Sequence, residues 1–350
     1  MRNKVLLATI FQNPEFESEP RREALADLAK LADLEYYTGD LTAEKVKGVI
    51  GVIANSAFIH SEFYAQGKDL RIISRWGVGY EKVNLAAATQ HGVLVTVAPE
   101  HMETVAEYTI AQWMATLKRV YTLNRLSHAG DFSIIRTYEA RGSALGLYGF
   151  GRIGQAVAAR ARPLLGAEGR LLVYDIRPDI QELAGKFGAV AVDDPMTLFR
   201  ECDTVSLHVA GDDTIVTYDR LCAMKPHASL INPSRGNLAD DQAVNRAIRE
   251  DRLCYYVVDD PVDGPREVHK DHPRIICTNH NAGITVESTI RLDRRTVGQV
   301  TDAIQGREPA HILNRDALKH PRVKAFLTHL TQSTGQVGVD VKYRRIPEAR

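Results

Sequence analysis

The sequence contains little that would tie it to a membrane, a nucleic acid or an oxidising compartment. Its four cysteines, Cys202, Cys222, Cys254 and Cys277, lie at least 20 residues apart with no CxxC pair. Neither a disulfide framework nor a zinc site is therefore expected. The 44 basic and 44 acidic residues cancel, so no overall field favours nucleic acid or an anionic membrane. No apolar run approaches the roughly 20 residues of a membrane span.

The first residues, MRNKVLLATIF, contain only a short apolar run before Gln12 and Pro14. This run is short for the core of a signal peptide, and no small-residue cleavage site follows it. We therefore expect a first β-strand here and a cytoplasmic protein. A small anionic substrate remains possible, because binding one needs only a local arginine.

The chain alternates short apolar runs with helical patterns, which is typical of parallel α/β architecture. Its 350 residues favour two domains rather than one core. A first series has predicted strands at 5–10, 49–54, 71–74 and 93–96, with a helix at 21–31. A long helical pattern at 104–126 and an irregular segment at 127–142 follow. The second series has predicted strands at 144–148, 171–174, 204–209, 229–231, 254–258 and 274–277, and helices at 152–165, 240–249 and 286–304.

The stretch LGLYGFGRIGQAVAARA places Gly149-x-Gly151-x-x-Gly154 between a predicted strand and a predicted helix. In that context the first glycine allows a tight turn, and the second lets the backbone approach a pyrophosphate. The third lets the helix pack closely on the strand, and the helix N-terminus offers free N–H groups. The pattern predicts a dinucleotide cofactor.

Asp175 ends the next predicted strand, 21 residues after Gly154. A carboxylate at this position accepts hydrogen bonds from the adenosine ribose and repels a 2′-phosphate, which favours NAD over NADP. Arg177 lies two residues further on and offers a possible partner for a 2′-phosphate, so both cofactors stay open on this evidence.

Three polar residues, Arg235, Asp259 and His280, follow three successive predicted strands. Open α/β sheets bind ligands at the carboxyl ends of their strands. Reduction of a ketone needs a carboxylate anchor, a charge near the carbonyl and a proton donor. Arginine supplies the first two and histidine the third. His269 and His272 are interpreted as part of a solvated loop rather than a metal site, and no metal is predicted.

Several motifs, in order, resemble those of the D-isomer-specific 2-hydroxyacid dehydrogenases over residues 45–315. The motifs are RWGVGYEKVNLAAATQHGVLVTVAP (75–99), AEYTIAQWM (106–114), LYGFGRIGQAVA (147–158), INPSRG (231–236) and NHNAG (279–283). The resemblance implies a Rossmann-type doubly wound NAD domain and a smaller flavodoxin-like α/β substrate domain. It implies NAD-dependent interconversion of a 2-hydroxy acid and a 2-keto acid.

The resemblance also implies roles for particular residues. Arg235 would bind the substrate carboxylate and carbonyl, and His280 would be the acid/base. The substrate would lie against Asn55, Ser56, Gly77, Val78 and Gly79. The cofactor would be held by Gly149, Gly151, Arg152, Ile153, Gly154, Asp175, His208, Val209, Ala210, Thr214, Pro233, Ser234 and Gly283, with Asp259 holding the carboxamide.

In domain terms, the resemblance implies a discontinuous substrate domain (1–103 and 296–330), an NAD domain (104–295) and a C-terminal tail (331–350). It implies a homodimer formed through the NAD domain, with residues 127–142 as an intersubunit arm.

The sequence departs from the family pattern at two positions. Ser234 replaces the usual alanine, which could add one hydrogen bond. Gly264 stands where the family has the glutamate that pairs with the histidine. Asp263 is the nearest replacement, Glu267 is the second candidate, and no partner at all is a third possibility. Two other functions stay open: an NAD(H)-sensing regulatory protein without turnover, and oxidation of formate or phosphite on this fold.

Overall fold

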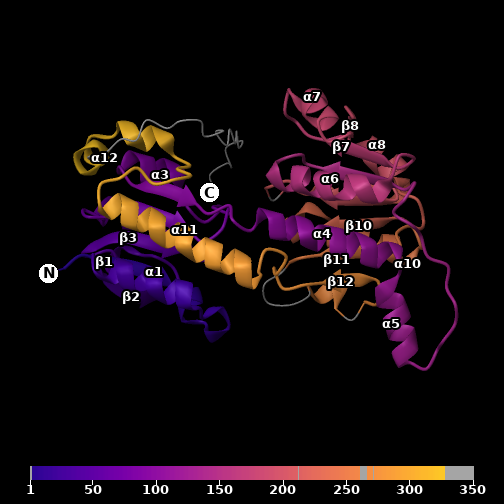
Figure 1. The fold of residues 1–350 in the computed structure, drawn as a ribbon, viewed down its shortest axis with the longest axis horizontal. Helices are drawn as coiled ribbons and strands as arrows, with labels where there is room; N and C mark the ends of the chain where they lie inside the picture. Colours follow the sequence, from indigo (N-terminus) through magenta and orange to yellow (C-terminus); the bar gives the residue numbers. More distant parts are fainter. Residues whose placement is uncertain (1, 212, 261–265, 271, 328–350) are drawn as a thin grey trace. The chain divides into compact units, whose positions relative to one another are not determined.

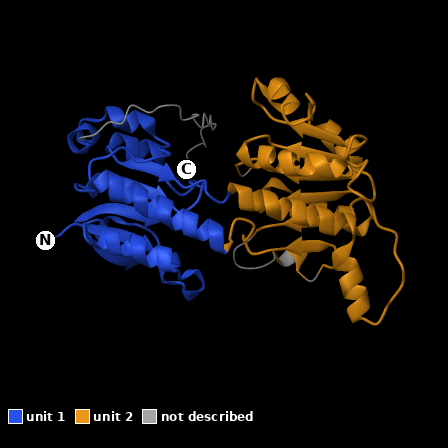
Figure 2. Ribbon diagram, in the orientation of Figure 1, with its two compact units in different colours: residues 1–101, 286–350 blue, residues 102–285 orange. Residues whose placement is uncertain are grey.

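Short apolar strands, each leading into a helix, build two separate parallel sheets in the computed structural model (Figure 1). The structure describes residues 2–327 apart from 212, 261–265 and 271. The chain divides into two compact units (Figure 2). Unit 1 comprises Met1–His101 and Val286–Arg350, and unit 2 comprises Met102–Thr285.

The sheet of unit 1 has the strand order β2-β1-β3-β4-β5, and all its pairs are parallel. This is the flavodoxin-like order. Every residue of β3, β4 and β5 is buried, as expected for parallel strands covered on both faces. The elements are β1 (Lys4–Ala8), α1 (Glu19–Ala29), β2 (Asp33–Tyr37), β3 (Val49–Ala54), α2 (Ser61–Gln66), β4 (Ile72–Arg75), α3 (Leu85–Gln90), β5 (Leu94–Val97), α11 (Val286–Ile304) and α12 (Pro321–Phe326).

Helix α11 returns to this sheet after the whole of unit 2 and lies against β3 and β4. Its Gln299 uses its full hydrogen-bonding capacity in the core. The amide oxygen accepts from Ser74 Oγ (2.7 Å) and Thr96 Oγ1 (2.9 Å), and the amide nitrogen donates to the carbonyls of Val97 and Ala310, each at 2.9 Å. A buried amide with every group paired fixes one position of the helix on the sheet.

A second polar group of α11, Asp293, forms a buried ion pair with Arg21 of α1. Both side chains are 1% exposed. Arg21 Nε and Nη2 donate to Asp293 Oδ2 (2.7 Å) and Oδ1 (3.1 Å), and Trp76 Nε1 donates to Oδ1 at 2.7 Å. The guanidinium also lies over the ring of Phe11. This network connects α1, α11 and the loop after β4.

The sheet of unit 2 has the order β12-β11-β10-β9-β6-β7-β8, again entirely parallel. Consecutive strands run outward in both directions from the neighbours β6 and β9, which is the doubly wound Rossmann arrangement. One core cluster contains α4 and α6 residues, and another contains α8, α9 and α10 residues. The strands are β6 (Ala144–Tyr148), β7 (Arg170–Tyr174), β8 (Val190–Ala191), β9 (Thr204–Leu207), β10 (Ser229–Asn232), β11 (Tyr255–Val258) and β12 (Ile275–Cys277).

The helices of unit 2 show one correction to the sequence-based expectations. A single helix over 104–126 is wrong, because the chain breaks at Arg119, whose φ is +51°. The carbonyl of Leu117, in the last turn of α4, accepts from the amide of Tyr138 instead. The helices are α4 (Met102–Leu117), α5 (Val120–His128), α6 (Arg152–Leu165), α7 (Ile180–Gly185), α8 (Met196–Glu201), α9 (Tyr218–Ala223) and α10 (Asp241–Arg249).

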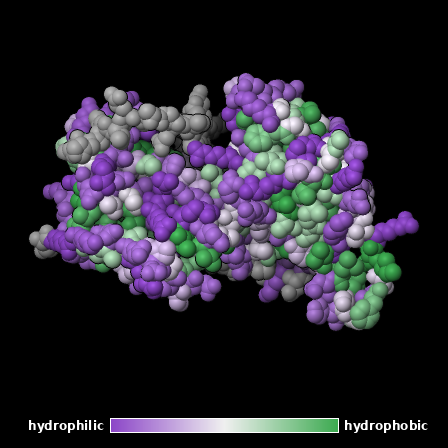
Figure 3. All heavy atoms as spheres, viewed as in Figure 1, coloured by the Kyte–Doolittle hydropathy of each residue, from purple (hydrophilic) through white to green (hydrophobic). Residues whose placement is uncertain are grey.

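Helix α5 and the segment after it form a projecting arm, which we define as residues 120–139 (Figure 1). No residue of α5 is buried. The arm exposes large apolar side chains, with Phe132 81% and Ile134 99% exposed. Hydrophobic residues gather on this part of the visible face (Figure 3).

The boundary between the two units falls between Thr285 and Val286, so all of α11 belongs to unit 1. The boundary expected at residue 295 falls inside this helix. Within the described part of the chain, no helix combines the length and the hydrophobicity that a membrane crossing requires.

We predict that Asp293→Asn destabilises unit 1, because it leaves the Arg21 guanidinium buried without a counter-charge. Breaking a buried pair in this way costs about 3–5 kcal/mol. In a Trp113→Phe background, Trp76 fluorescence during urea unfolding reports on unit 1 alone. The control is Asp302→Asn, since Asp302 of α11 forms a solvent-accessible pair with Arg307, which follows the helix, and such pairs contribute about 1 kcal/mol or less. Equal losses in the two variants would contradict the prediction.

Candidate functional site

The glycine-rich turn after β6 has the geometry that a pyrophosphate cradle requires. Gly149 has a φ of +98°, and a Cβ there would lie 2.5 Å from the carbonyl oxygen of His208. A Cβ on Gly154 would press against the carbonyl oxygen of Gly149, whereas one on Gly151 would meet nothing within 4 Å. Gly151 is also the N-cap of α6 and provides no side-chain cap. Open space and free N–H groups therefore coincide at the start of the helix.

Asp175 directly follows β7 and is connected to this turn. Its Oδ2 accepts from the amide of Phe150 at 2.6 Å, and its Oδ1 accepts from the amide of Arg177 at 3.0 Å. A carboxylate has about four acceptor positions, so it can accept further donors. The Arg177 guanidinium forms an ion pair with Asp179. The arginine that the sequence offered as a partner for a 2′-phosphate therefore already has a carboxylate partner.

The residues that follow β9 lie against the glycine-rich turn. His208, Val209 and Ala210 leave the strand next to β6, and the amide of His208 donates to the carbonyl of Tyr148. Burial lowers the pKa of His208 to about 3, so its ring is neutral near pH 7. Ser234 adds the hydrogen bond that the sequence suggested, since its Oγ donates to the carbonyl of Leu207 at 2.8 Å. Of the other predicted cofactor residues, Arg152 and Ile153 begin α6, Thr214 is exposed, and Pro233 and Gly283 are half-buried.

Arg235 lies in the turn after β10, and neighbouring polar groups fix this turn. Its carbonyl accepts from Asn232 Nδ2 at 2.8 Å. The amide of Gly236 donates to Asp260 Oδ2 at 3.1 Å, and Asp260 also pairs with Arg266 at 3.2 Å. The Arg235 side chain is half-buried, and its Nη1 donates to the carbonyl of Ser234.

Asp259 and His280 follow the two adjacent strands, β11 and β12. Asn232, Val258 and Cys277 lie in register across β10, β11 and β12, so Arg235, Asp259 and His280 leave neighbouring strands at the same edge. His280 is exposed, with a φ of +52°. The Asp259 carboxylate is buried and accepts from three protein donors, Thr278 Oγ1, Asn281 N and Ala282 N. Sequence reasoning assigned Asp259 to the carboxamide and missed these three bonds.

The predicted substrate residues form a separate cluster in unit 1, after strands β3 and β4. Asn55 and Ser56 follow β3, while Gly77, Val78 and Gly79 follow β4, its parallel neighbour. Gly77 has a φ of +127°, and the carbonyl of Gly79 accepts from Arg75 Nε at 2.8 Å. Trp76, inside this loop, is buried and bonded to Asp293. The hydrogen bond of Trp76 thus holds the loop in place, while the backbone of Gly77 and Gly79 stays partly exposed.

Two expectations about the region after β11 have different outcomes. Asp263 and Gly264 lie outside the described residues, and so does the Glu267 side chain. The interpretation of His269 as part of a solvated loop is wrong. His269 is 2% exposed, lies 3.6 Å from Asp241 and packs edge-on against Tyr256. Burial lowers the pKa of its imidazole.

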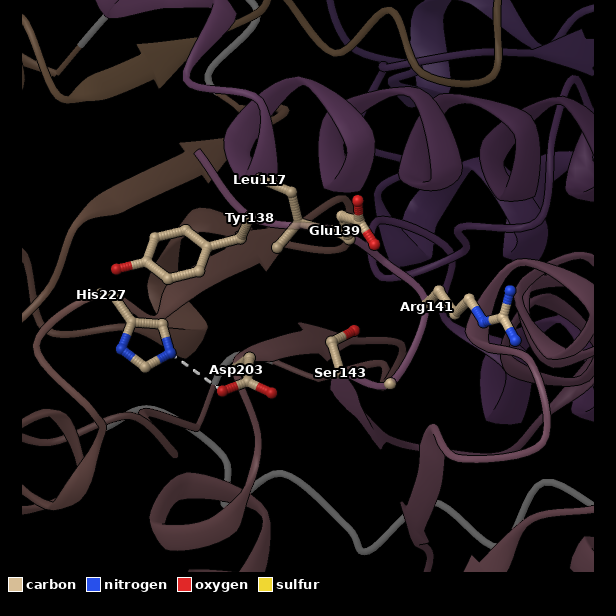
Figure 4. A pocket seen from close by; sticks show the side chains of 8 residues that line it. Leu117, Tyr138, Glu139, Arg141, Ser143, Asp203 and His227 are labelled. Carbon is tan, nitrogen blue, oxygen red and sulfur yellow. Dashed lines mark hydrogen bonds and ion pairs between the residues drawn. The ribbon is translucent and has the colours of Figure 1, made fainter. Parts of the chain in front are cut away.

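A cavity of about 200 Å³ lies at the opposite edge of the unit 2 sheet (Figure 4). Its Ser143, Asp203 and His227 precede strands β6, β9 and β10 rather than follow them. Asp203 Oδ1 bonds His227 Nε2 at 2.9 Å and Lys225 Nζ at 2.6 Å, and Oδ2 accepts from the amide of Ala144. Tyr138 of the arm stacks on His227. These polar groups bond to one another and connect the starts of three strands, which indicates a structural role.

Comparison with known proteins gives consistent matches. Residues 110–282 match the model of the D-isomer specific 2-hydroxyacid dehydrogenase NAD binding domain. A glyoxylate reductase of Aeropyrum pernix is 28% identical over 281 residues, which cover 75% of this chain and 81% of that protein. A D-3-phosphoglycerate dehydrogenase of Methanocaldococcus jannaschii is 27% identical over 309 residues. These residues cover 83% of this chain and 57% of that protein. The crystal structure of the TT0316 protein from Thermus thermophilus superposes with a TM-score of 0.75 at 27% identity, covering 89% of this chain and 99% of that one.

Proposed function

Since this chain belongs to the D-isomer specific 2-hydroxyacid dehydrogenase family, we propose that Arg235 and His280 perform its chemistry. The overall reaction is the NAD-dependent interconversion of a 2-hydroxy acid and a 2-keto acid. The observation that carries the proposal is the register of β10, β11 and β12. It brings an arginine and a histidine to the sheet edge at which the glycine-rich turn also lies.

The residues of unit 2 fit the dinucleotide. The turn Gly149–Gly154 and the free N–H groups of α6 would hold the pyrophosphate, and Asp175 would accept from the ribose. His208, Val209, Ala210, Thr214, Pro233, Ser234 and Gly283 would line the rest. NADH, when bound, supplies the hydride.

The chain's own side chains would do the remaining work. The planar Arg235 guanidinium would bind the substrate carboxylate through two parallel hydrogen bonds and polarise the adjacent carbonyl. The exposed His280 would give a proton to the oxygen of the new alcohol in reduction and take it back in oxidation, since histidine exchanges protons near neutral pH. Asn55, Ser56 and the Gly77-Val78-Gly79 backbone of unit 1 would contact the substrate. Unit 1 would thus be the substrate domain and unit 2 the NAD domain.

A small 2-keto acid is the substrate class that we favour, because the A. pernix relative is named a glyoxylate reductase. The test is NADH oxidation by the purified chain with glyoxylate, pyruvate and longer 2-keto acids. Turnover with at least one of them supports the proposal. NADH binding without turnover would instead indicate an NAD(H) sensor, which no observation favours.

We predict that Arg235→Lys lowers kcat/KM for the best keto acid by about 100-fold or more, because lysine keeps the charge but loses the bidentate fork. The melting temperature should stay near the wild-type value. Arg249→Lys, at an exposed position of α10, is the matched control and should behave like the wild type. Unchanged kinetics in Arg235→Lys would mean that another residue anchors the carboxylate.

We predict that the wild type prefers NADH over NADPH and that Asp175→Ala reduces this preference at least about 10-fold. The physical reason is that the carboxylate repels a 2′-phosphate while Asp179 engages Arg177. The ratio of kcat/KM values for the two cofactors measures the effect. Asp219→Ala, which removes an exposed carboxylate elsewhere in unit 2, should leave the ratio unchanged. Equal use of both cofactors by the wild type would contradict the assignment.

We also propose that the arm, residues 120–139, binds a second copy of the chain. The support is its exposed apolar surface: Val120 is 49% exposed, Phe132 81% and Ile134 99%. Large contiguous apolar surfaces on a protein mark interaction sites.

Light scattering of the intact chain should therefore give about twice the chain mass of 38.9 kDa. Ile134→Asp should shift the protein toward the single-chain mass, because a charge would be buried in the interface. Val190→Asp, a comparable change at another exposed apolar position, should leave the mass unchanged. A wild type of single-chain mass would rule out this dimer.

A further inference from the structure

The backbone of His280 has a conformation that must be held in place by its surroundings. Its φ of +52° lies in the left-handed region, which only a few per cent of non-glycine residues adopt. The amide of His280 donates to the carbonyl of Thr278 at 3.0 Å, so the turn is tight. Such conformations persist where neighbouring contacts over-determine them.

A single carboxylate holds the chain on both sides of His280. Asp259 Oδ1 accepts from Thr278 Oγ1 at 2.5 Å and from the amide of Asn281 at 2.8 Å, and Oδ2 accepts from the amide of Ala282 at 2.7 Å. Asp259 is only 3% exposed, so water does not compete for these bonds. The histidine is thereby bracketed by anchors two residues before it and one and two residues after it.

A tyrosine of α4 extends this network. Tyr108 Oη lies 2.8 Å from Thr278 Oγ1. The threonine hydroxyl has one proton, and the Asp259 carboxylate can only accept, so Thr278 donates to Asp259. Tyr108 must then donate to Thr278. Burial raises the pKa of Tyr108, so it keeps the proton that this bond uses.

We propose that Thr278 and Tyr108 are positioning residues for His280. The donors run in one direction, from Tyr108 to Thr278 to Asp259, and the carboxylate at the end fixes the turn that presents the imidazole. The inference rests on the proposed role of His280 as acid/base. It also gives Asp259 a role in holding the histidine turn, in addition to the one expected at the carboxamide.

This arrangement makes a specific demand on kinetics. Proton transfer requires the donor within hydrogen-bonding distance of the reacting oxygen, and a displacement of about 1 Å can cost about 100-fold in rate. Loosening the turn should therefore lower kcat. It should leave NADH affinity nearly unchanged, because neither Thr278 nor Tyr108 belongs to the proposed cofactor site.

The kinetic test uses Thr278→Val, which keeps the shape of the side chain but removes the hydroxyl. We expect kcat to fall about 10- to 100-fold while the dissociation constant of NADH changes less than about 3-fold. Thr278→Ser should restore kcat to within about 3-fold of the wild type, and Tyr108→Phe should give a smaller loss. Tyr218→Phe, which removes an exposed phenol of the same unit bonded to Glu250, is the control and should not change kcat.

A second measurement is independent of turnover. Hydrogen exchange of the amides of Asn281 and Ala282, in the intact chain without substrate, should be slow in the wild type and faster in Thr278→Val, but not in Thr278→Ser or Tyr218→Phe. The exchange measurement tests the anchor even if the protein reduces no keto acid. A lack of turnover would overturn the proposed function but not the anchor.

Three results would overturn the positioning role. One is a wild-type kcat and wild-type exchange in Thr278→Val. Another is a weakened NADH affinity that accounts for the whole loss of activity. The third is failure of Thr278→Ser to restore kcat although exchange returns to the wild-type rate.

Discussion

Parallel pairing of strands is the constraint on which the candidate site depends. Every strand of the unit 2 sheet runs in the same direction, so the residues that follow the strands collect at one edge, whatever their separation in sequence. The glycine-rich turn, Asp175, Arg235 and His280 lie along the same edge of the sheet for this reason. Asp203 illustrates the converse at the other edge, where it bonds the start of β6 and the side chains of Lys225 and His227 before β10.

The sequence predicted the elements whose pattern is set by burial on both faces. Strands 49–54 and 144–148 and helices 152–165 and 286–304 have the bounds that the structure shows. Short elements such as α7, α8 and β8 escaped because six or fewer residues contain too little periodicity to be detected. The break at Arg119 escaped as well, because strong helix formers surround it. It depends on a distant partner, the amide of Tyr138.

The strand-end positions of the candidate residues were predictable from the sequence. Their supporting contacts were not, because they join residues that no motif links. Tyr108 and Thr278 are 170 positions apart, and a tyrosine in a helical pattern is more often a packing residue. One signal was present: Asp259 and the NHNAG motif were expected at the ends of successive strands, and the backbone N–H groups of a turn are hydrogen-bond donors for a nearby carboxylate.

The ion pair between Arg21 and Asp293 joins residues 272 positions apart. During synthesis the five strands of unit 1 leave the ribosome first, while α11 follows only after all of unit 2. Until then Arg21 has no Asp293, and Ser74 and Thr96 lack the Gln299 amide that their hydroxyls contact. Domains tend to fold in the order of translation, so unit 2 can finish before unit 1. The first part of the chain to be made would then be the last to reach its native state, with a sheet face exposed to chaperones or to other nascent chains for most of translation.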